Sequence, residues 1–139
     1  MKHFIRAFQL YGVFSGRSTR EEYWMFTFIY MLVYLLLTAI STAFESQLFQ
    51  ILFALFSLGV IIPNLSITAR RLHDAGHSGW WQIAPFIGLV FAGIGVVQAS
   101  STLSLLAGIA LTFALAIVLL VFLVKPSDED NQYGTKPQP

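Results

Sequence analysis

The side chains that could perform chemistry in this chain are concentrated in one stretch, Arg70 to Trp81, which reads RRLHDAGHSGWW. A His next to an Asp suggests a general base, and two His residues four positions apart on a helix can bind a metal ion. However, His73 and Asp74 are adjacent, so their side chains would point about 100° apart on a helix. The HExxH pattern of metalloproteases is also absent, because no Glu follows His73. We therefore predict no catalytic residue, no metal site and no cofactor, and structural roles for both histidines.

The composition of the chain indicates the environment of this stretch. Hydrophobic residues make up 56% of the sequence and charged residues only 11%, whereas soluble domains carry about 25% charged residues. The chain has no cysteine, which excludes disulfides, thiolate metal sites and cysteine nucleophiles. We therefore expect a membrane protein rather than a water-soluble domain, and no nucleic-acid partner.

Four apolar segments are candidates for membrane helices, which need about 20 apolar residues each. They cover residues 24–44, 48–69, 81–97 and 103–124, and the third is the shortest and the most interrupted by Gly and Pro. We predict an all-α integral membrane protein in which these helices form one four-helix bundle. Residues 1–125 would form this single membrane domain, and residues 126–139 a polar cytoplasmic tail.

The distribution of positive charge predicts the orientation of the bundle. Four of the eight Lys and Arg residues precede the first span, two lie between the second and third spans, and two follow the fourth. With four spans, all eight lie on one side of the membrane, which the positive-inside rule makes the cytoplasmic side, with both termini inside. With three spans, Lys125 and Lys136 would lie on the opposite side, so the charges favour four.

The first 14 residues are not a signal peptide, because the first apolar segment begins too late and is too long. Phe4, Phe8, Tyr11 and Phe14 recur at the spacing of one helix face. This pattern predicts an amphipathic helix over residues 2–14 that lies in the membrane interface. Packing of the same helix against its own bundle is an equal alternative.

The start of the first span carries a capping signal. Gly16 permits a turn, and Ser18 followed three residues later by Glu21 is typical of a capping box. Thr19 with Glu22 offers the same box one residue later, so two registers are open.

Two further signals concern how the helices end and pack. The second span is expected to continue to His73 or Asp74 and to stop at Gly76, a residue suited to the left-handed conformation after a helix. Small residues about one helical turn apart favour close contact between membrane helices. On the third segment they are Gly88 with Ala92 and Gly95 with Ala99; on the fourth they are Ala107, Ala110 and Ala114.

The charged residues on the cytoplasmic side would lie at one membrane depth. There, Arg71 and Asp74 are three positions apart and can form a local ion pair. Other opposite charges can pair across helices, and arginines can bind lipid phosphate with two hydrogen bonds. The predicted binding cluster on this face consists of Arg17, Arg20, Glu21, Glu22, Arg70, Arg71, His73, Asp74 and Trp80.

Three motifs together resemble a known family. FSGRSTREEYW, RRLHDAGHSGWW and NQYG occur here in the order found in the YhaH-like bacterial inner-membrane proteins, a domain of unknown function. The resemblance covers nearly the whole chain. It implies a small multi-helix protein of the bacterial inner membrane and supplies no activity. One departure is the lead into NQYG, which is SDED here and often rich in Gly and Pro in the family, so docking of the tail stays open.

The leading interpretation of function is a non-enzymatic scaffold, assembly factor or regulatory subunit. Its cytoplasmic face would bind a protein partner, a second copy of the chain or anionic phospholipid of the surrounding bilayer. Two alternatives stay open: a membrane-interface enzyme that acts on a lipid headgroup, and a transporter or channel subunit. The spans contain no deeply placed Asp, Glu, Lys or Arg, which counts against coupled transport.

Overall fold

The computed structural model describes residues 2–44, 46–97 and 102–137. These residues form helices and no strand, apart from an isolated bridge between Asn131 and Gly134. The helices are α1 (Lys2–Gln9), α2 (Arg20–Phe44), α3 (Gln47–Asp74), the 3₁₀ helix η1 (Gly79–Ile83), α4 (Ala84–Val97) and α5 (Thr102–Val124).

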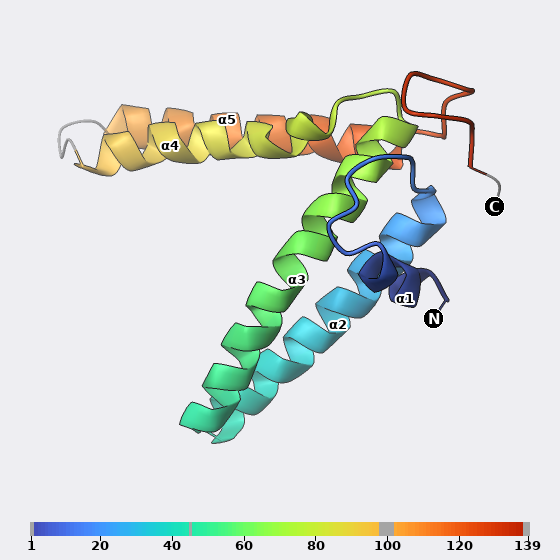
Figure 1. The fold of residues 1–139 in the computed structure, drawn as a ribbon. Helices are drawn as coiled ribbons and strands as arrows, with labels where there is room; N and C mark the ends of the chain where they lie inside the picture. The colour runs from blue at the N-terminus through green and yellow to red at the C-terminus, as the bar shows by residue number, and fades with distance from the viewer. Residues whose placement is uncertain (1, 45, 98–101, 138–139) are drawn as a thin grey trace.

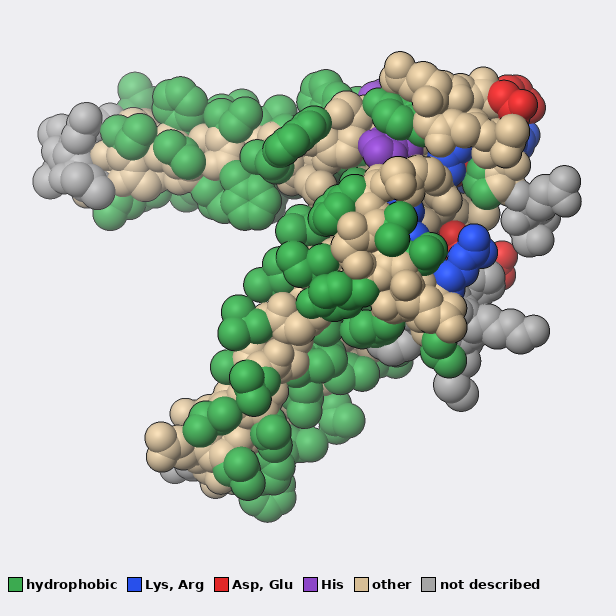
Figure 2. All heavy atoms as spheres, in the orientation of Figure 1, with side chains coloured by type: hydrophobic (Ala, Val, Ile, Leu, Met, Phe, Trp, Pro, Cys, Tyr) green, Lys and Arg blue, Asp and Glu red, His purple; other side chains and the backbone are tan. Residues whose placement is uncertain are grey.

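The long helices form two antiparallel hairpins, α2 with α3 and α4 with α5, which diverge from a common end (Figure 1). Helices α3 and α5 contact each other only near that end, so the single four-helix bundle predicted from the sequence is not formed. Burial gives little reason to close such a bundle in a membrane, because lipid chains are as apolar as the helix faces. Figure 2 shows apolar side chains along both hairpins and charged side chains gathered where the hairpins meet.

Among the described residues, three helices are long and apolar enough to cross a membrane: α2 with 25 residues, α3 with 28 and α5 with 23. The predicted third span is instead divided into η1 and the 14-residue α4. At about 1.5 Å per residue, α4 alone is shorter than the hydrocarbon core of about 30 Å. Pro85 lies in the first turn of α4, where its missing N–H removes no helical hydrogen bond.

The α4–α5 hairpin is held by close contact at small residues. Gly108 is buried, and a Cβ atom there would collide with the backbone of Ala92. A Cβ atom at Gly88 would likewise collide with the backbone of Thr112. The prediction for Gly88 and Ala92 is therefore confirmed.

The prediction for the fourth segment was wrong, because Ala107, Ala110 and Ala114 are exposed and α5 presents Gly108 instead. Ala99, the partner predicted for Gly95, lies outside the described residues.

Gly108→Val is expected to destabilise the protein by about 1–3 kcal/mol, because the added atoms meet backbone, which cannot move aside without separating the helices. The melting temperature in detergent measures the effect. Ala110→Val, at an exposed position of the same helix, is the control and should be nearly neutral. Equal melting temperatures for the two variants would show that the contact does not hold the hairpin.

The α2–α3 hairpin has an aromatic core. Phe26 is fully buried, and its ring stacks on Tyr30, which stacks in turn on Phe56 of α3. Helix α1 packs against this core: Ala7 is buried, and the rings of Phe8 and Phe26 lie 6.1 Å apart.

The N-terminal helix is shorter than the predicted 2–14, because it ends at Gln9 and the chain turns at Gly12 with φ +78°. Tyr11 and Phe14 lie beyond the helix and are exposed, so they do not extend its apolar face. The structure shows packing of α1 against its own hairpin, and the location of α1 in the membrane interface stays a prediction.

Candidate functional site

The site is built where three chain segments meet: the residues before α2, the end of α3 and the tail. Helix α2 begins with the later of the two capping registers. The Glu22 N–H donates to Thr19 Oγ1 (3.1 Å), and the Thr19 N–H donates to Glu22 Oε2 (3.3 Å). The buried Ser18 instead donates its backbone N–H to the carbonyl of Arg70 (3.1 Å), which fixes this segment against α3.

Helix α3 ends as predicted, at Asp74, with Gly76 at φ +77°. The turn is closed by the His77 N–H, which donates to the carbonyl of Leu72 (2.8 Å). Asp74 is fully buried in this turn.

Asp74 is the centre of a buried cluster that we call the Asp74 clamp: Arg17, Arg71, Asp74 and Ser127. Oδ1 accepts a hydrogen bond from Arg17 Nε (3.0 Å) and forms an ion pair with Arg17 Nη2 (2.9 Å). Oδ2 accepts from Arg71 Nη1 and from Ser127 Oγ (2.6 Å). The Arg17 side chain is 2% exposed and those of Arg71 and Asp74 are 0% exposed. One carboxylate therefore neutralises part of the charge of two buried guanidinium groups.

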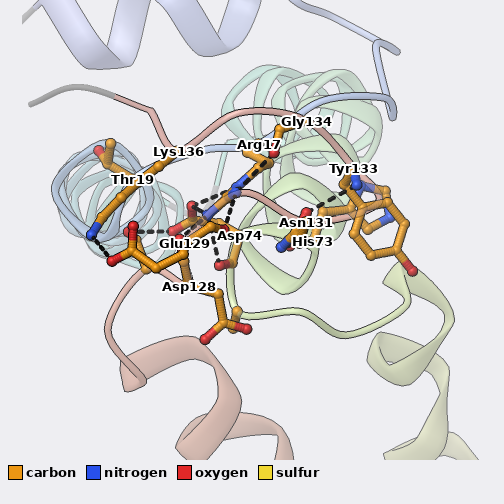
Figure 3. Close-up of polar contacts among 12 residues, drawn as sticks. Arg17, Thr19, His73, Asp74, Asp128, Glu129, Asn131, Tyr133, Gly134 and Lys136 are labelled. Carbon is orange, nitrogen blue, oxygen red and sulfur yellow. Dashed lines mark hydrogen bonds and ion pairs between the residues drawn. The ribbon is translucent and has the colours of Figure 1, made fainter.

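The remaining donors of Arg17 bind the tail (Figure 3). Nη1 donates to the carbonyls of Glu129 (2.8 Å) and Gly134 (3.0 Å), and Nη2 donates to the carbonyl of Asp128 (2.6 Å). The Asp128 N–H in turn donates to the carbonyl of Asp74 (3.0 Å). The described part of the tail is thus docked over the end of α3, despite its acidic SDED lead.

Arg71 closes the end of α5. Its Nε donates to the carbonyl of Leu123 (3.0 Å), and its Nη2 donates to the carbonyl of Lys125. The last carbonyls of a helix have no partner within it and carry partial negative charge. The guanidinium therefore binds the orphan carbonyl of Leu123 in the last turn of α5 and the carbonyl of Lys125 just beyond it. Because it also pairs with Asp74 of α3, it connects one hairpin to the other.

His73 has a structural environment. Its Nδ1 lies 3.1 Å from the carbonyl of Gly16, so this nitrogen carries the proton. Its ring stacks on Tyr133 with centroids 3.9 Å apart, and its carbonyl accepts from Asn131 Nδ2 (3.0 Å). The Asp74 carboxylate faces the two arginines rather than this imidazole. No group of three or more potential metal ligands occurs among the described residues.

Of the other residues in the predicted cluster, some are buried and some are exposed to solvent. Glu22 is buried and pairs with Arg6 of α1 (2.8 Å). Arg70 is 3% exposed, and its Nε has no hydrogen-bond partner among the described residues. Arg20, Glu21 and Trp80 are exposed.

The inward position of Arg71 corrects one expectation. The Arg71 guanidinium is 0% exposed and bonds to Asp74, Leu123 and Lys125, so a lipid phosphate at the surface does not reach it. The same holds for Arg17, whose donors are taken by Asp74 and the tail.

Sequence reasoning missed the residues that complete the site, namely Arg6, Ser127, Asn131 and Tyr133. Asn131 and Tyr133 belong to the NQYG motif, which was the feature of the sequence that could have identified them.

Comparisons with known proteins bear on the family resemblance of the three motifs. A family model described as "Protein of unknown function (DUF805)" matches residues 11–135, which include all three motifs. The inner membrane protein YhaI of Escherichia coli K12 is 37% identical over 91 residues, 63% of this chain and 76% of YhaI. The inner membrane protein YhaH of the same strain is 31% identical over 94 residues, 63% of this chain and 78% of YhaH. No solved structure matches this chain. The resemblance to YhaH-like proteins is confirmed.

Proposed function

Because this chain belongs to the DUF805 family of unknown function, with inner membrane proteins among its relatives, we propose that it is a non-enzymatic scaffold, assembly or regulatory protein of the bacterial inner membrane. Its cytoplasmic face would bind a protein partner or anionic phospholipid. The observation that carries this proposal is the Asp74 clamp, in which the groups most suited to catalysis are used to hold the fold together.

The residues of the clamp and the neighbouring His73 have few groups available to take part in a reaction. The Asp74 carboxylate already accepts three hydrogen bonds and has a further ion-pair contact with Arg17, and His73 is fixed between Gly16 and Tyr133. A general base must lie within reach of a substrate proton, and the Asp74 side chain is 0% exposed. The clamp instead makes a rigid base for the surface groups around it.

The surface over the clamp has a groove suited to a partner. A cavity of about 360 Å³ lies between the start of α2 and the tail, and Arg20, Glu21 and Lys136 are among its lining residues. Both signs of charge are present and exposed. This mixed surface fits a protein segment or a lipid phosphate held by Arg20 and Lys136.

A photocrosslinking amino acid at Glu21 tests this proposal in cells. We expect a discrete adduct with a protein or an anionic lipid, which Arg20→Glu removes. The same amino acid at Leu103, an exposed position at the opposite end of the α4–α5 hairpin, is the control and should not give that adduct. Absence of any adduct at Glu21, or the same adduct at both positions, would overturn the proposal.

We infer further that both termini are cytoplasmic, from the Lys and Arg distribution. Reporter fusions after Phe14 and after Pro139 should both report the cytoplasm, and a fusion at Ser46 should report the far side. A fusion after Pro139 that reports the far side would mean that η1 and the short α4 do not cross the membrane, and the tail would then lie opposite Arg17.

His73→Gln separates the scaffold from the interface enzyme. Gln can still donate to the Gly16 carbonyl but cannot exchange a proton near neutral pH. We expect the melting temperature to fall by the equivalent of less than about 1.5 kcal/mol, the size of a lost aromatic contact with Tyr133. The crosslink from Glu21 should be unchanged. Loss of cellular function with folding and crosslinking intact would favour the enzyme.

A further inference from the structure

The Arg70 side chain is buried without the bonds that a buried charge normally has. Arg70 is 3% exposed, its Nε has no hydrogen-bond partner, and it forms no ion pair with another described residue. Arg17 and Arg71, which are equally buried, both bond to Asp74. A buried guanidinium without such bonds is unfavourable, because nothing replaces the water that solvates it in the unfolded chain. Arg70 therefore favours a rearrangement that brings a carboxylate to it.

Glu22 is the carboxylate that attracts Arg70. The two residues lie close together, because the Ser18 N–H donates to the carbonyl of Arg70 and the N–H of the next residue, Thr19, donates to Glu22 Oε2. However, Glu22 Oε1 pairs with Arg6 of α1 (2.8 Å), and the charge of Arg6 repels Arg70. Two arginines therefore compete for one carboxylate.

The arginine that holds this carboxylate is the more exposed of the two. The Arg6 side chain is 62% exposed, so water solvates its charge whether or not it is paired. Ion pairs with an exposed partner contribute little to stability for this reason. The phosphate of an anionic lipid can bind the same guanidinium with two hydrogen bonds. Transfer of Arg6 from Glu22 to a phosphate therefore costs little, and it leaves Glu22 to the buried Arg70.

Helix α1 and the residues after it carry apolar side chains that the protein does not cover. Of residues 5–9, only Ala7 is buried. Ile5 and Phe8 are exposed, and so are Tyr11 and Phe14 beyond the helix. The membrane interface takes up apolar side chains of this kind, and anionic headgroups attract the basic residues beside them. The interface therefore offers α1 a second place to bind.

We propose that α1 is a conformational switch that responds to anionic lipid. A lipid phosphate takes Arg6 from Glu22, Glu22 pairs with Arg70, and α1 moves from the α2–α3 hairpin into the membrane interface. The exchange involves none of the residues that line the groove at Arg20, so it holds or fails independently of the scaffold role.

The test uses the full chain in nanodiscs of phosphatidylcholine, with and without phosphatidylglycerol of identical acyl chains. Because the sequence has no cysteine, spin labels can be attached to introduced cysteines. Labels at Ile5 in α1 and at Leu48 near the start of α3, both exposed, report the position of α1. We expect phosphatidylglycerol to raise the ratio of a second distance to the first about fivefold, the upper end of the effect of one exposed ion pair. Labels at Leu48 and Leu65, both on α3, are the control and should keep one distance.

Three variants identify the residues that exchange partners. Arg70→Met removes the charge that receives Glu22 and keeps an unbranched side chain at the buried position. We expect it to cancel the response, so that α1 stays on the hairpin in both lipids. Arg20→Met removes the same charge from an exposed position and, as the matched control, should keep the response. Arg6→Gln should show the second distance in phosphatidylcholine alone, because Arg6 no longer competes with Arg70 for Glu22.

Four results would overturn the proposal. The same distances with and without phosphatidylglycerol would show that α1 does not respond to anionic lipid. A full response of Arg70→Met would show that Glu22 does not turn to Arg70. Loss of the response in Arg20→Met would show that the total positive charge of this face controls α1. The first distance alone for Arg6→Gln in phosphatidylcholine would show that the Arg6–Glu22 pair does not hold α1 on the hairpin.

Discussion

Asp74→Asn is expected to destabilise the folded protein by about 3–5 kcal/mol, because it removes the one carboxylate that two buried guanidinium groups share. The amide keeps the size of the side chain and one acceptor oxygen. It loses the negative charge and places an NH2 group against donors of Arg17, Arg71 or Ser127. Breaking a buried ion pair on one side is costly because the remaining charge has no water to solvate it.

The unfolding free energy of Asp74→Asn in mild detergent measures this effect. Asp130→Asn is the matched control, since Asp130 is exposed and its Oδ1 accepts only the Lys136 N–H (2.9 Å) among the described residues. We expect the control to change stability by less than about 0.5 kcal/mol. A small loss in both variants would mean that solvent reaches the Asp74 clamp.

Arg71→Lys is expected to destabilise the protein by about 3 kcal/mol although it keeps the positive charge. The guanidinium reaches Asp74, Leu123 and Lys125 through three different nitrogens. A lysine has one nitrogen on a flexible stem and cannot hold this arrangement, and each lost hydrogen bond to a charged group is worth about 1.5–3 kcal/mol. The carbonyls of Leu123 and Lys125 would then lose the donors that Arg71 supplies.

Two measurements follow the Arg71→Lys variant. Stability in detergent gives the energy, and the distance between spin labels on the far ends of α3 and α5 reports whether the hairpins stay at a fixed angle. We expect a broader distance distribution in the variant. Arg20→Lys, at an exposed arginine, is the control. Identical behaviour of the two variants would show that the planar fork of Arg71 is not what joins the hairpins.

Local features of this fold were predictable because they depend on neighbouring residues. Hydropathy placed the long helices within a few residues, and Gly76 gave the end of α3 through its need for a left-handed conformation. The Arg71–Asp74 pair followed from a spacing of three on a helix. The capping box was predicted in two registers, and the structure uses Thr19 with Glu22.

Long-range features were not predictable from spacing. Ser127 and Tyr133 contact residues of α3 more than 50 positions away, and no periodicity connects the two segments. The divergence of the hairpins was missed because apolar helix faces look alike whether they pack on protein or on lipid. The role of Arg17 was also missed in part. A charged residue near a membrane is expected to lie on the protein surface, whereas the Arg17 side chain is almost entirely covered by the tail.

The contacts of Arg17 also set an order of events during biosynthesis. Its partners in the tail, the carbonyls of Asp128, Glu129 and Gly134, lie 111, 112 and 117 positions later in the chain. At translation rates of about 5–20 residues per second, Arg17 waits several seconds after leaving the ribosome before these groups exist. All the membrane helices are made in that interval, while the end of α3 is still open. The junction can therefore close only after all the membrane helices have been synthesised. A nascent chain that stalls before Ser127 already has the partners of Arg71 but lacks the three tail carbonyls that Arg17 binds.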